Sequence, residues 1–469
     1  MYLNNIASKK PKQRLKELVI FFYIYMILEG MLRKWLIPTL NKEIYFLKDF
    51  FLICIYSYAF KHKFLFEKKI SKIFTIFIIS ILFFGAIGYN FNKIEVLSFI
   101  AGARSYFLFV PLFFIIVHTF SIKDIKKFVK INLYFILPYY ILVLFQTYSP
   151  HEAYINSGYK SLVQNPERPS AYFTYITQNS YYFLFLITSY YSYLNGQSSL
   201  GKKKLFLSSV LIFLLMGIMI LLKSRAVYVY TFAIIIYSSY INFVSNENKS
   251  LKFKKLIILL IITPIFFSIN TSLFENQYKF SAERINKDDY KSMSFYKEYK
   301  GHEFKNEFLI KLLKKFGHTD NLFGSIREFC IKNSSICRVI NEIYFFPSLK
   351  YSSFFGEGLG AGTPMVVHLS EKKQFYLGEA ENHRIIGELG YFFGTVLVLF
   401  KYLFFVFLNL KFFFSKRIKN KLLLFPFLIF VTVTFLIGPI TYTTSFISFI
   451  CWFTLGILLT SENENKNTS

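Results

Sequence analysis

Long apolar runs follow one another through almost the whole sequence, and this pattern constrains the fold more than any other feature. The chain has 469 residues, of which 54% are hydrophobic and 21% aromatic. A run of roughly 20 apolar residues can cross a membrane as a helix, and a soluble protein does not carry so many of them. We therefore predict an all-α integral membrane protein with about twelve spans, near 16–37, 44–60, 73–89, 95–119, 127–147, 172–194, 204–222, 226–244, 254–270, 385–410, 422–439 and 440–460.

Positive charge predicts the orientation of these spans. The formal net charge is +28, but the lysines stand in short runs between apolar segments, which is typical of cytoplasmic membrane loops and not of a nucleic-acid site. With twelve spans, six basic segments share one side with both termini: 9–16, 61–72, 123–130, 201–204, 249–255 and 411–421. We therefore expect no nucleic-acid partner and two cytoplasmic termini. The first run lacks a small-residue cleavage site, so we expect a retained helix rather than a signal peptide.

The remaining connections fall on the outer side, and one of them is long. They are the segments 39–42, 148–171, 222–226 and 271–384. Long loops are exempt from the charge rule, so the lysines of 271–384 do not contradict the orientation. We divide the chain into a membrane bundle of about nine spans, an extracytoplasmic cap, C-terminal membrane helices and a polar cytoplasmic tail, at 1–270, 271–384, 385–460 and 461–469.

Five arginines fall toward the outer side: Arg33, Arg104, Arg168, Arg225 and Arg384. Arg104 is the most informative, because it lies well inside an expected span. A guanidinium there costs several kcal/mol unless it is paired or lines a wet cavity. The alternatives are a side chain that reaches the interface, or a span that begins later than expected.

Two further arginines stand in short polar motifs. Arg225 lies in "LLKSRAVYV", where two apolar runs meet almost directly. Its planar fork of donors suits a lipid-linked phosphate, although the position taken by itself favours a simple interfacial anchor. Arg168 precedes a polar cluster that enters the next span, and this cluster either bonds to other helices or lines a sugar-binding cavity. Its members are Thr174, Thr177, Gln178 and Asn179.

Several ionisable residues stand directly before the span near 385–410. Glu381, Arg384 and Glu388 are spaced to share one helix face, while His383 points elsewhere. Two interpretations are open: a salt-bridge stripe at a charged helix end, or a carboxylate that accepts a proton from a hydroxyl. The preceding "FFGEGLGAGT" at 354–363 lacks the lysine of a P-loop, so we expect a tight turn where the outer loop re-enters the membrane.

The long outer loop carries two more patterns. Apolar residues recur on one face of 304–316, which predicts an amphipathic helix lying on the membrane or packed on the core of the cap. Cys330 and Cys337 are separated by a sequence that permits a turn, so we expect a disulfide between them in an oxidising compartment. Cys54 and Cys451 fall in expected spans and are expected to be packing residues.

The order of these motifs resembles the bacterial O-antigen polymerase and ligase family. The resemblance rests on "RPSAYFTYITQNSYYF", "LLKSRAVYV", "FFGEGLGAGT" and "GEAENHRIIGELGYFFG", in this order. The segment "EGMLRKWLIP" at 29–38, followed by "FLKDFFL", resembles a branch of polysaccharide polymerases in that family. The resemblance spans nearly the whole chain.

The resemblance implies a metal-independent glycosyltransferase without a cofactor, acting at the periplasmic face of the bacterial inner membrane. Its donor is a glycan on undecaprenyl pyrophosphate, and a chain-length regulator is a possible partner beside membrane lipids. By position, Arg225 corresponds to a pyrophosphate-binding arginine, with Arg104 and Arg168 as helpers, and Arg33 and Arg384 complete the expected substrate-binding set.

One departure from the family pattern bears on the branch. Ligases carry a histidine nine residues before the glutamate of "ELG", and here that position holds Glu379. His383 is close but out of register, so we favour the polymerase branch, with Glu379 or Glu381 as the base and His383 third. The alternatives are an O-antigen ligase that transfers the glycan to lipid A core, and a flippase for lipid-linked oligosaccharides.

Overall fold

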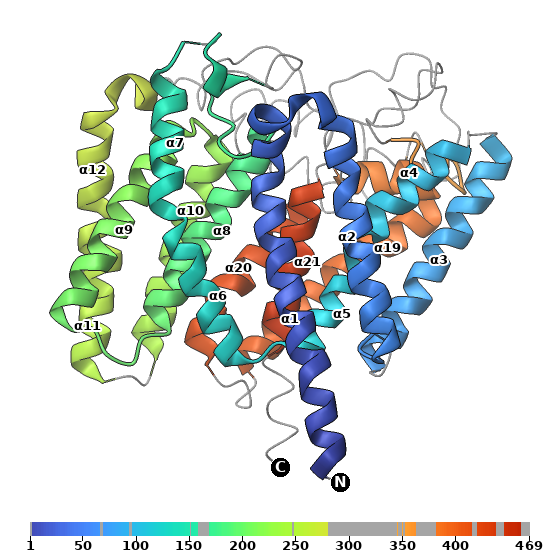
Figure 1. The fold of residues 1–469 in the computed structure, drawn as a ribbon, viewed down its shortest axis with the longest axis horizontal. Helices are drawn as coiled ribbons and strands as arrows, with labels where there is room; N and C mark the ends of the chain where they lie inside the picture. The colour runs from blue at the N-terminus through green and yellow to red at the C-terminus, as the bar shows by residue number, and fades with distance from the viewer. Residues whose placement is uncertain are drawn as a thin grey trace, which may run out of the picture.

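The computed structural model describes most of the membrane bundle in atomic detail. The described residues are 2–65, 69–92, 96–150, 152–157, 168–245, 248–279, 345, 349, 352–362, 381–414, 420–437 and 445–460. Within these ranges the regular structure is helical, and they contain no strand (Figure 1). The predicted amphipathic helix at 304–316, the cysteines Cys330 and Cys337, and the tail 461–469 lie outside the described residues.

Helices occupy each of the ranges where a span was expected. They are α1 (Tyr2–Met31), α2 (Asn41–Lys61), α3 (Lys69–Asn92), α4 (Val96–Phe107), α5 (Val110–Thr119), α6 (Ile122–Tyr134), α7 (Ile136–Tyr148), α8 (Ile176–Asn195), α9 (Lys202–Leu221), α10 (Arg225–Val244), α11 (Lys249–Ile257), α12 (Thr263–Leu273), α19 (Glu381–Phe414), α20 (Lys421–Ile437) and α21 (Ser445–Thr460). Four short elements join them: the π-helical η1 (Leu32–Leu36) and η4 (Ile258–Ile262), and the 3-10 turns η2 (Pro38–Leu40) and η3 (Tyr154–Asn156).

Six helical stretches in the described residues are long and apolar enough to cross a membrane. They are 96–119, 122–148, 202–221, 226–244, 249–273 and 381–414. The expected α-helical membrane protein is therefore confirmed.

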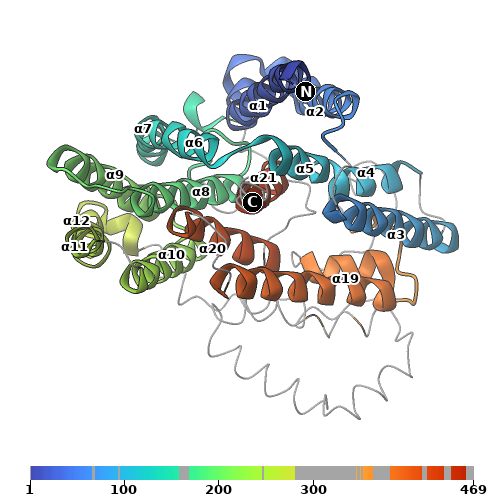
Figure 2. The same cartoon turned by 90° about the horizontal axis from the view of Figure 1, so that it is seen from below.

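Aromatic side chains fill the centre of the bundle. Helix α21 lies in the middle, with α5, α8 and α20 packed around it (Figure 2). The Tyr23 ring of α1 is fully buried and contacts the rings of Phe128, Phe185 and Phe453. Its hydroxyl donates to the Asn132 side chain, so the polar end of this tyrosine is satisfied inside the bundle.

The fourth expected span is broken into α4 and α5. Pro111 stands in the first turn of α5, where its missing N–H is tolerated but where a continuous helix would lose a hydrogen bond. Arg104 therefore lies in the last turn of α4, next to the negative end of the helix dipole. The break turns a position deep in an expected span into a position beside a helix end.

Helix α19 is sharply bent at Gly390. This residue has φ 85° and ψ 163°, a conformation that is essentially restricted to glycine. The bend exposes backbone groups, and the segment 352–362 satisfies them. Glu357 N–H donates to Gly387 O at 2.8 Å, Gly358 N–H donates to Glu388 O at 3.0 Å, and Tyr391 N–H donates to Ser353 O at 3.0 Å.

The same segment, 352–362, also packs on α3 and α4. A Cβ atom at Gly360 would lie 2.1 Å from the Ser98 carbonyl oxygen of α4, so this contact requires glycine. Leu359 is fully buried, with its side chain against Gly85 of α3. The glycine-rich sequence thus forms the tight fold that was predicted, and it joins α3 and α4 to the bend of α19.

Asn382 ties the two parts of bent α19 together. Its Nδ2 donates to the Tyr402 hydroxyl at 2.8 Å, and its Oδ1 accepts from Lys401 Nζ. Lys401 and Tyr402 lie beyond Gly390, whereas Asn382 lies before it. A buried amide in this position satisfies polar groups that would otherwise face an apolar interior.

We expect Asn382→Leu to lower the free energy of unfolding by about 1–3 kcal/mol, because polar partners lose a bond inside the bundle. Thermal unfolding in detergent measures the effect. Ser80→Ala is the control, since the Ser80 hydroxyl bonds to the Ile76 carbonyl of its own helix. Equal midpoints for Asn382→Leu and Ser80→Ala would contradict the role given to Asn382.

Candidate functional site

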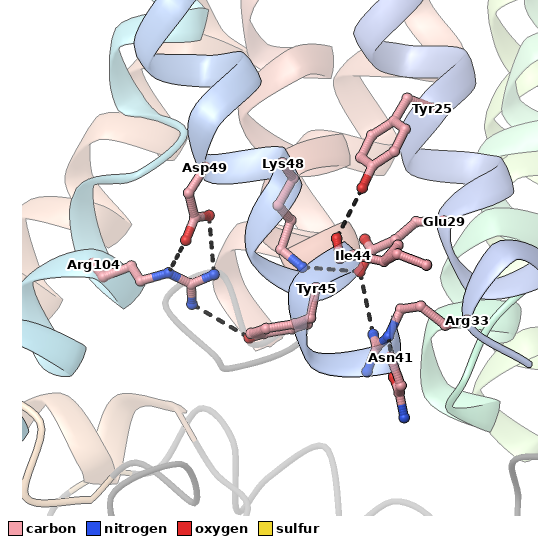
Figure 3. Close-up of polar contacts among 9 residues, drawn as sticks. All are labelled: Tyr25, Glu29, Arg33, Asn41, Ile44, Tyr45, Lys48, Asp49 and Arg104. Atoms are coloured by element: carbon pink, nitrogen blue, oxygen red, sulfur yellow. Dashed lines mark hydrogen bonds and ion pairs between the residues drawn. The ribbon is translucent and has the colours of Figure 1, made fainter. Parts of the chain in front are cut away.

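The described residues place five charged side chains around one tyrosine ring (Figure 3). Four elements of the N-terminal region supply them: α1, η1, α2 and α4. Glu29 lies in the last turn of α1, Arg33 lies in η1, and Lys48 and Asp49 lie on α2 with Tyr45. Arg104 comes from the last turn of α4. We call this group the Tyr45 cluster: Glu29, Arg33, Tyr45, Lys48, Asp49 and Arg104.

Arg104 is held by a two-pronged ion pair. Its Nε donates to Asp49 Oδ2 at 2.8 Å and its Nη2 donates to Asp49 Oδ1 at 3.0 Å. Its Nη1 donates to the Tyr45 hydroxyl at 3.3 Å. The requirement for a partner is therefore met by Asp49, and the guanidinium is fixed in one orientation. The sequence left open whether Arg104 is paired, lines a wet cavity or reaches the membrane interface. In the structure it is paired with Asp49.

Glu29 joins two cations on neighbouring elements. Its Oε1 accepts from Lys48 Nζ at 3.0 Å and from Arg33 Nη1 at 3.2 Å. Arg33 Nε donates further to Asn41 Oδ1 at 2.6 Å, while its Nη2 makes no hydrogen bond to a described residue. Arg33 therefore keeps donors available for a ligand.

The Tyr45 ring brings three cations close together. Lys48 Nζ lies 3.4 Å from the ring centroid, and the guanidinium carbons of Arg33 and Arg104 lie 5.0 and 5.1 Å from it. Each separation is within the range in which a cation is attracted to an aromatic face. The two guanidinium carbons are consequently no more than about 10 Å apart.

Accessibility divides the Tyr45 cluster into a floor and a rim. The Lys48 side chain is fully buried and that of Glu29 is 9% exposed, whereas Arg33, Arg104 and Asp49 retain 15%, 17% and 20%. The cluster lies toward the end of the bundle where α1 connects to α2, opposite the end where α1 begins (Figure 1).

Lys34 places a buried amine next to the cluster. Its Nζ donates to Ser170 Oγ at 3.1 Å and to the Ala171 carbonyl at 2.6 Å, and it lies 4.4 Å from the Trp35 ring centroid. These contacts, all with described residues, are uncharged. Burial among neutral partners disfavours the charged form of an amine, so Lys34 adds hydrogen-bond donors rather than a fixed positive charge next to the cluster.

The segment that receives Lys34 also places Arg168. Ala171 has φ 46°, an uncommon conformation for a non-glycine residue, and its N–H donates to Gln146 Oε1. Arg168 Nε donates to the Leu222 carbonyl at 3.3 Å in the turn between α9 and α10. The segment thus connects η1 to this turn. Asn179 bonds to the Pro169 carbonyl and the Tyr139 hydroxyl, so this member of the polar cluster serves helix packing.

The predicted tight turn before Arg225 is present. Helix α9 ends at Leu221 and α10 begins at Arg225, with Lys223 in a left-handed conformation at φ 50°. The side chain of Arg225 lies outside the described part of the structure. Its proposed contact with phosphate therefore stays a prediction.

The ionisable residues at the start of α19 form a second, buried group. Glu381, His383, Arg384 and Glu388 are each at most 3% exposed. Glu388 Oε1 accepts from Gly362 N–H at 3.0 Å, and the Tyr106 side chain of α4 lies beside Glu388 and Arg384. This group helps to hold the segment 352–362 against α19. Glu379 lies outside the described residues.

Helix α4 separates the two groups. Arg104 and Tyr106 are two residues apart and therefore point in roughly opposite directions from the helix axis, at about 200° of rotation. Arg104 faces α2, and Tyr106 faces the start of α19. The structure brings Arg33 and Arg104 together and places Arg384 on the far side of α4.

Sequence reasoning missed four members of the Tyr45 cluster as site residues: Glu29, Tyr45, Lys48 and Asp49. Glu29 and the Lys48–Asp49 pair interrupt apolar runs, and intramembrane ionisable residues are functional candidates on that ground alone. Their pairing with Arg33 and Arg104 could not be read from sequence order.

The Tyr45 cluster combines fixed donors with carboxylates, a set that suits an anionic ligand more than a metal ion. Within the described ranges, no three histidine, cysteine, aspartate and glutamate side chains gather closely enough to hold a metal. The chain matches no protein-family model, no curated protein and no solved structure.

Proposed function

We propose that this membrane protein is a polysaccharide polymerase that joins oligosaccharide repeat units carried on undecaprenyl pyrophosphate. The charge balance at the Tyr45 cluster carries the proposal. The cations Arg33, Lys48 and Arg104 stand against two carboxylates, Glu29 and Asp49, which leaves an excess of one positive charge. A diphosphate that links a lipid to a sugar carries one negative charge on each phosphate, so a site with excess positive charge and exposed guanidinium donors favours it.

The geometry of the rim supports the same ligand. Arg33 and Arg104 are partly exposed, and their guanidinium carbons lie close enough for each to bind one phosphate of a diphosphate. Guanidinium groups match phosphate oxygens with two parallel donors and do not lose their charge. The next candidates for contacts with the glycan are Arg168 and Arg225. Arg168 bonds to the Leu222 carbonyl in the turn between α9 and α10, and Arg225 is the first residue of α10 after that turn.

The reaction would be a transfer at the anomeric carbon of the donor sugar. The acceptor hydroxyl of another lipid-linked repeat unit forms the new C–O bond, and the bond from that carbon to the diphosphate breaks. The departing diphosphate takes the electron pair, so negative charge grows where the arginines lie. Hydrogen-bond donors that are already in place for this negative charge stabilise the transition state.

The proposal includes an orientation in the membrane. We infer twelve spans in a bacterial inner membrane, with the end where α1 begins in the cytoplasm and the Tyr45 cluster toward the periplasm. The basic connections expected on the cytoplasmic side support this orientation. A chain-length regulator and membrane lipids would be the partners.

We expect Arg33→Gln to lower polymer formation by about 100-fold or more, because a donor to the departing diphosphate is lost. The protein should remain folded, since Glu29 keeps its bond to Lys48. The measurement is a gel of surface glycans from a deletion strain rescued with each variant. Lys42→Gln is the matched control, because it removes an exposed cation from the start of α2.

The same gel separates the alternative functions. Loss of the long ladder with a core-plus-one-repeat band retained indicates a polymerase. Loss of every band with repeat units, while lipid-linked polymer accumulates, indicates a ligase. Repeat units trapped at the cytoplasmic face indicate a flippase. An unchanged ladder in the deletion strain, or full rescue by Arg33→Gln, contradicts the proposed role.

A further inference from the structure

Asp49 is the most accessible carboxylate of the Tyr45 cluster. Its side chain is 20% exposed, against 9% for Glu29. Glu381 and Glu388 at the start of α19 are 3% and 0% exposed. A group that receives a proton from a substrate must be able to touch it, and among these described carboxylates Asp49 meets this condition best.

The surroundings of Asp49 fix its direction. Arg104 donates to both carboxylate oxygens, at 2.8 and 3.0 Å, which holds the carboxylate in one orientation. Glu29 differs, because one of its oxygens already accepts from two cations, Arg33 and Lys48. Asp49 is therefore an oriented, partly exposed carboxylate beside the two guanidinium groups that would hold the diphosphate.

We propose that Asp49 accepts the proton of the acceptor hydroxyl during glycosyl transfer, an inference that rests on the proposed function. The acceptor oxygen bonds to the anomeric carbon as its proton passes to a carboxylate oxygen of Asp49. The electron pair of the broken carbon–oxygen bond leaves with the diphosphate. Asp49 then releases the proton to water, which restores the carboxylate.

Arg104 links this proton transfer to donor binding. The same guanidinium that pairs with Asp49 faces the proposed diphosphate. A phosphate that draws Arg104 toward itself weakens the bonds to Asp49, and a carboxylate oxygen becomes free to accept the proton when the donor is in place. In the absence of donor, the ion pair keeps both oxygens of Asp49 occupied and oriented.

The test uses the full chain in lipid nanodiscs with a polyprenyl-diphosphate oligosaccharide as donor. Donor binding and turnover at saturating donor are measured separately. We expect Asp49→Asn to lower kcat by about 100-fold or more, the usual contribution of a positioned base, with the donor Kd unchanged or lower. Glu43→Gln is the matched control, because it removes an exposed carboxylate from the first turn of the same helix.

Three outcomes overturn the inference. A kcat of Asp49→Asn within about threefold of wild type excludes a base at this position, because a base contributes far more. A parallel loss of kcat and donor affinity indicates that Asp49 only holds Arg104. If Asp49→Asn does not fold, Asp49→Ser provides the test, because it also removes the carboxylate: a reduced kcat at unchanged Kd supports the inference, and wild-type kcat overturns it. Failure of the wild-type protein to extend the donor instead overturns the proposed function.

Discussion

Arg104→Leu is expected to abolish polymer formation and to destabilise the protein severely. The substitution leaves Asp49 without its two-pronged partner inside the bundle, while it removes one of two arginines from the proposed diphosphate site. Breaking a buried ion pair by removing one partner costs roughly 3–5 kcal/mol, and the partial exposure of this pair places the cost at the lower end. The readouts are the thermal unfolding midpoint in detergent and the surface-glycan ladder.

A double substitution separates the two effects. Asp49→Leu combined with Arg104→Leu replaces the ion pair with apolar side chains, which is often neutral for stability. We expect the double variant to unfold at nearly the wild-type temperature and to remain without activity. A double variant that regains the ladder would show that the Arg104 pair serves the fold alone.

Gly390→Ala is expected to prevent the bend of α19 from forming. A side chain at this φ and ψ is strained, and its Cβ would lie 2.0 Å from the Phe354 carbonyl oxygen. The clash is with backbone, which cannot move aside like the end of a flexible side chain. We expect a loss of at least about 3 kcal/mol and little folded protein, measured by the yield of monodisperse material in detergent.

Gly201→Ala is the control for this substitution. Gly201 precedes α9, and a Cβ there would have nothing within 4 Å. We expect an effect of less than about 1 kcal/mol, since only the helix start is touched. If Gly390→Ala gave the same yield as Gly201→Ala, the bend would not depend on glycine.

The helices were predictable because membrane spans are local features. Each needs only a run of apolar residues of sufficient length, and every expected range contains helix. The interruptions were harder to predict. Pro111 marks the break between α4 and α5, but Gly390 gives no sign that it adopts a positive φ, because glycine occurs in many straight membrane helices.

The candidate site was only partly predictable from the sequence. The need for a partner to Arg104 followed from the cost of an isolated charge in a span, but Asp49 lies 55 residues earlier on another helix. Nothing local indicates that Tyr45 would gather three cations. Likewise, Glu381 and His383 were favoured as bases for their place in a motif, and the structure buries both.

The joint between the segment 352–362 and α19 has a consequence for biosynthesis. The start of α19 carries Glu381, Arg384 and Glu388, which an elongating chain cannot cheaply leave in lipid. The segment 352–362, which packs against Arg384 and Glu388, leaves the ribosome earlier, and the faces of α3 and α4 that contact it are made earlier still. Helices α3 and α4 are thus made before the segment 352–362, and this segment is made before α19. The charged start of α19 can therefore pack against the segment as soon as it is synthesised.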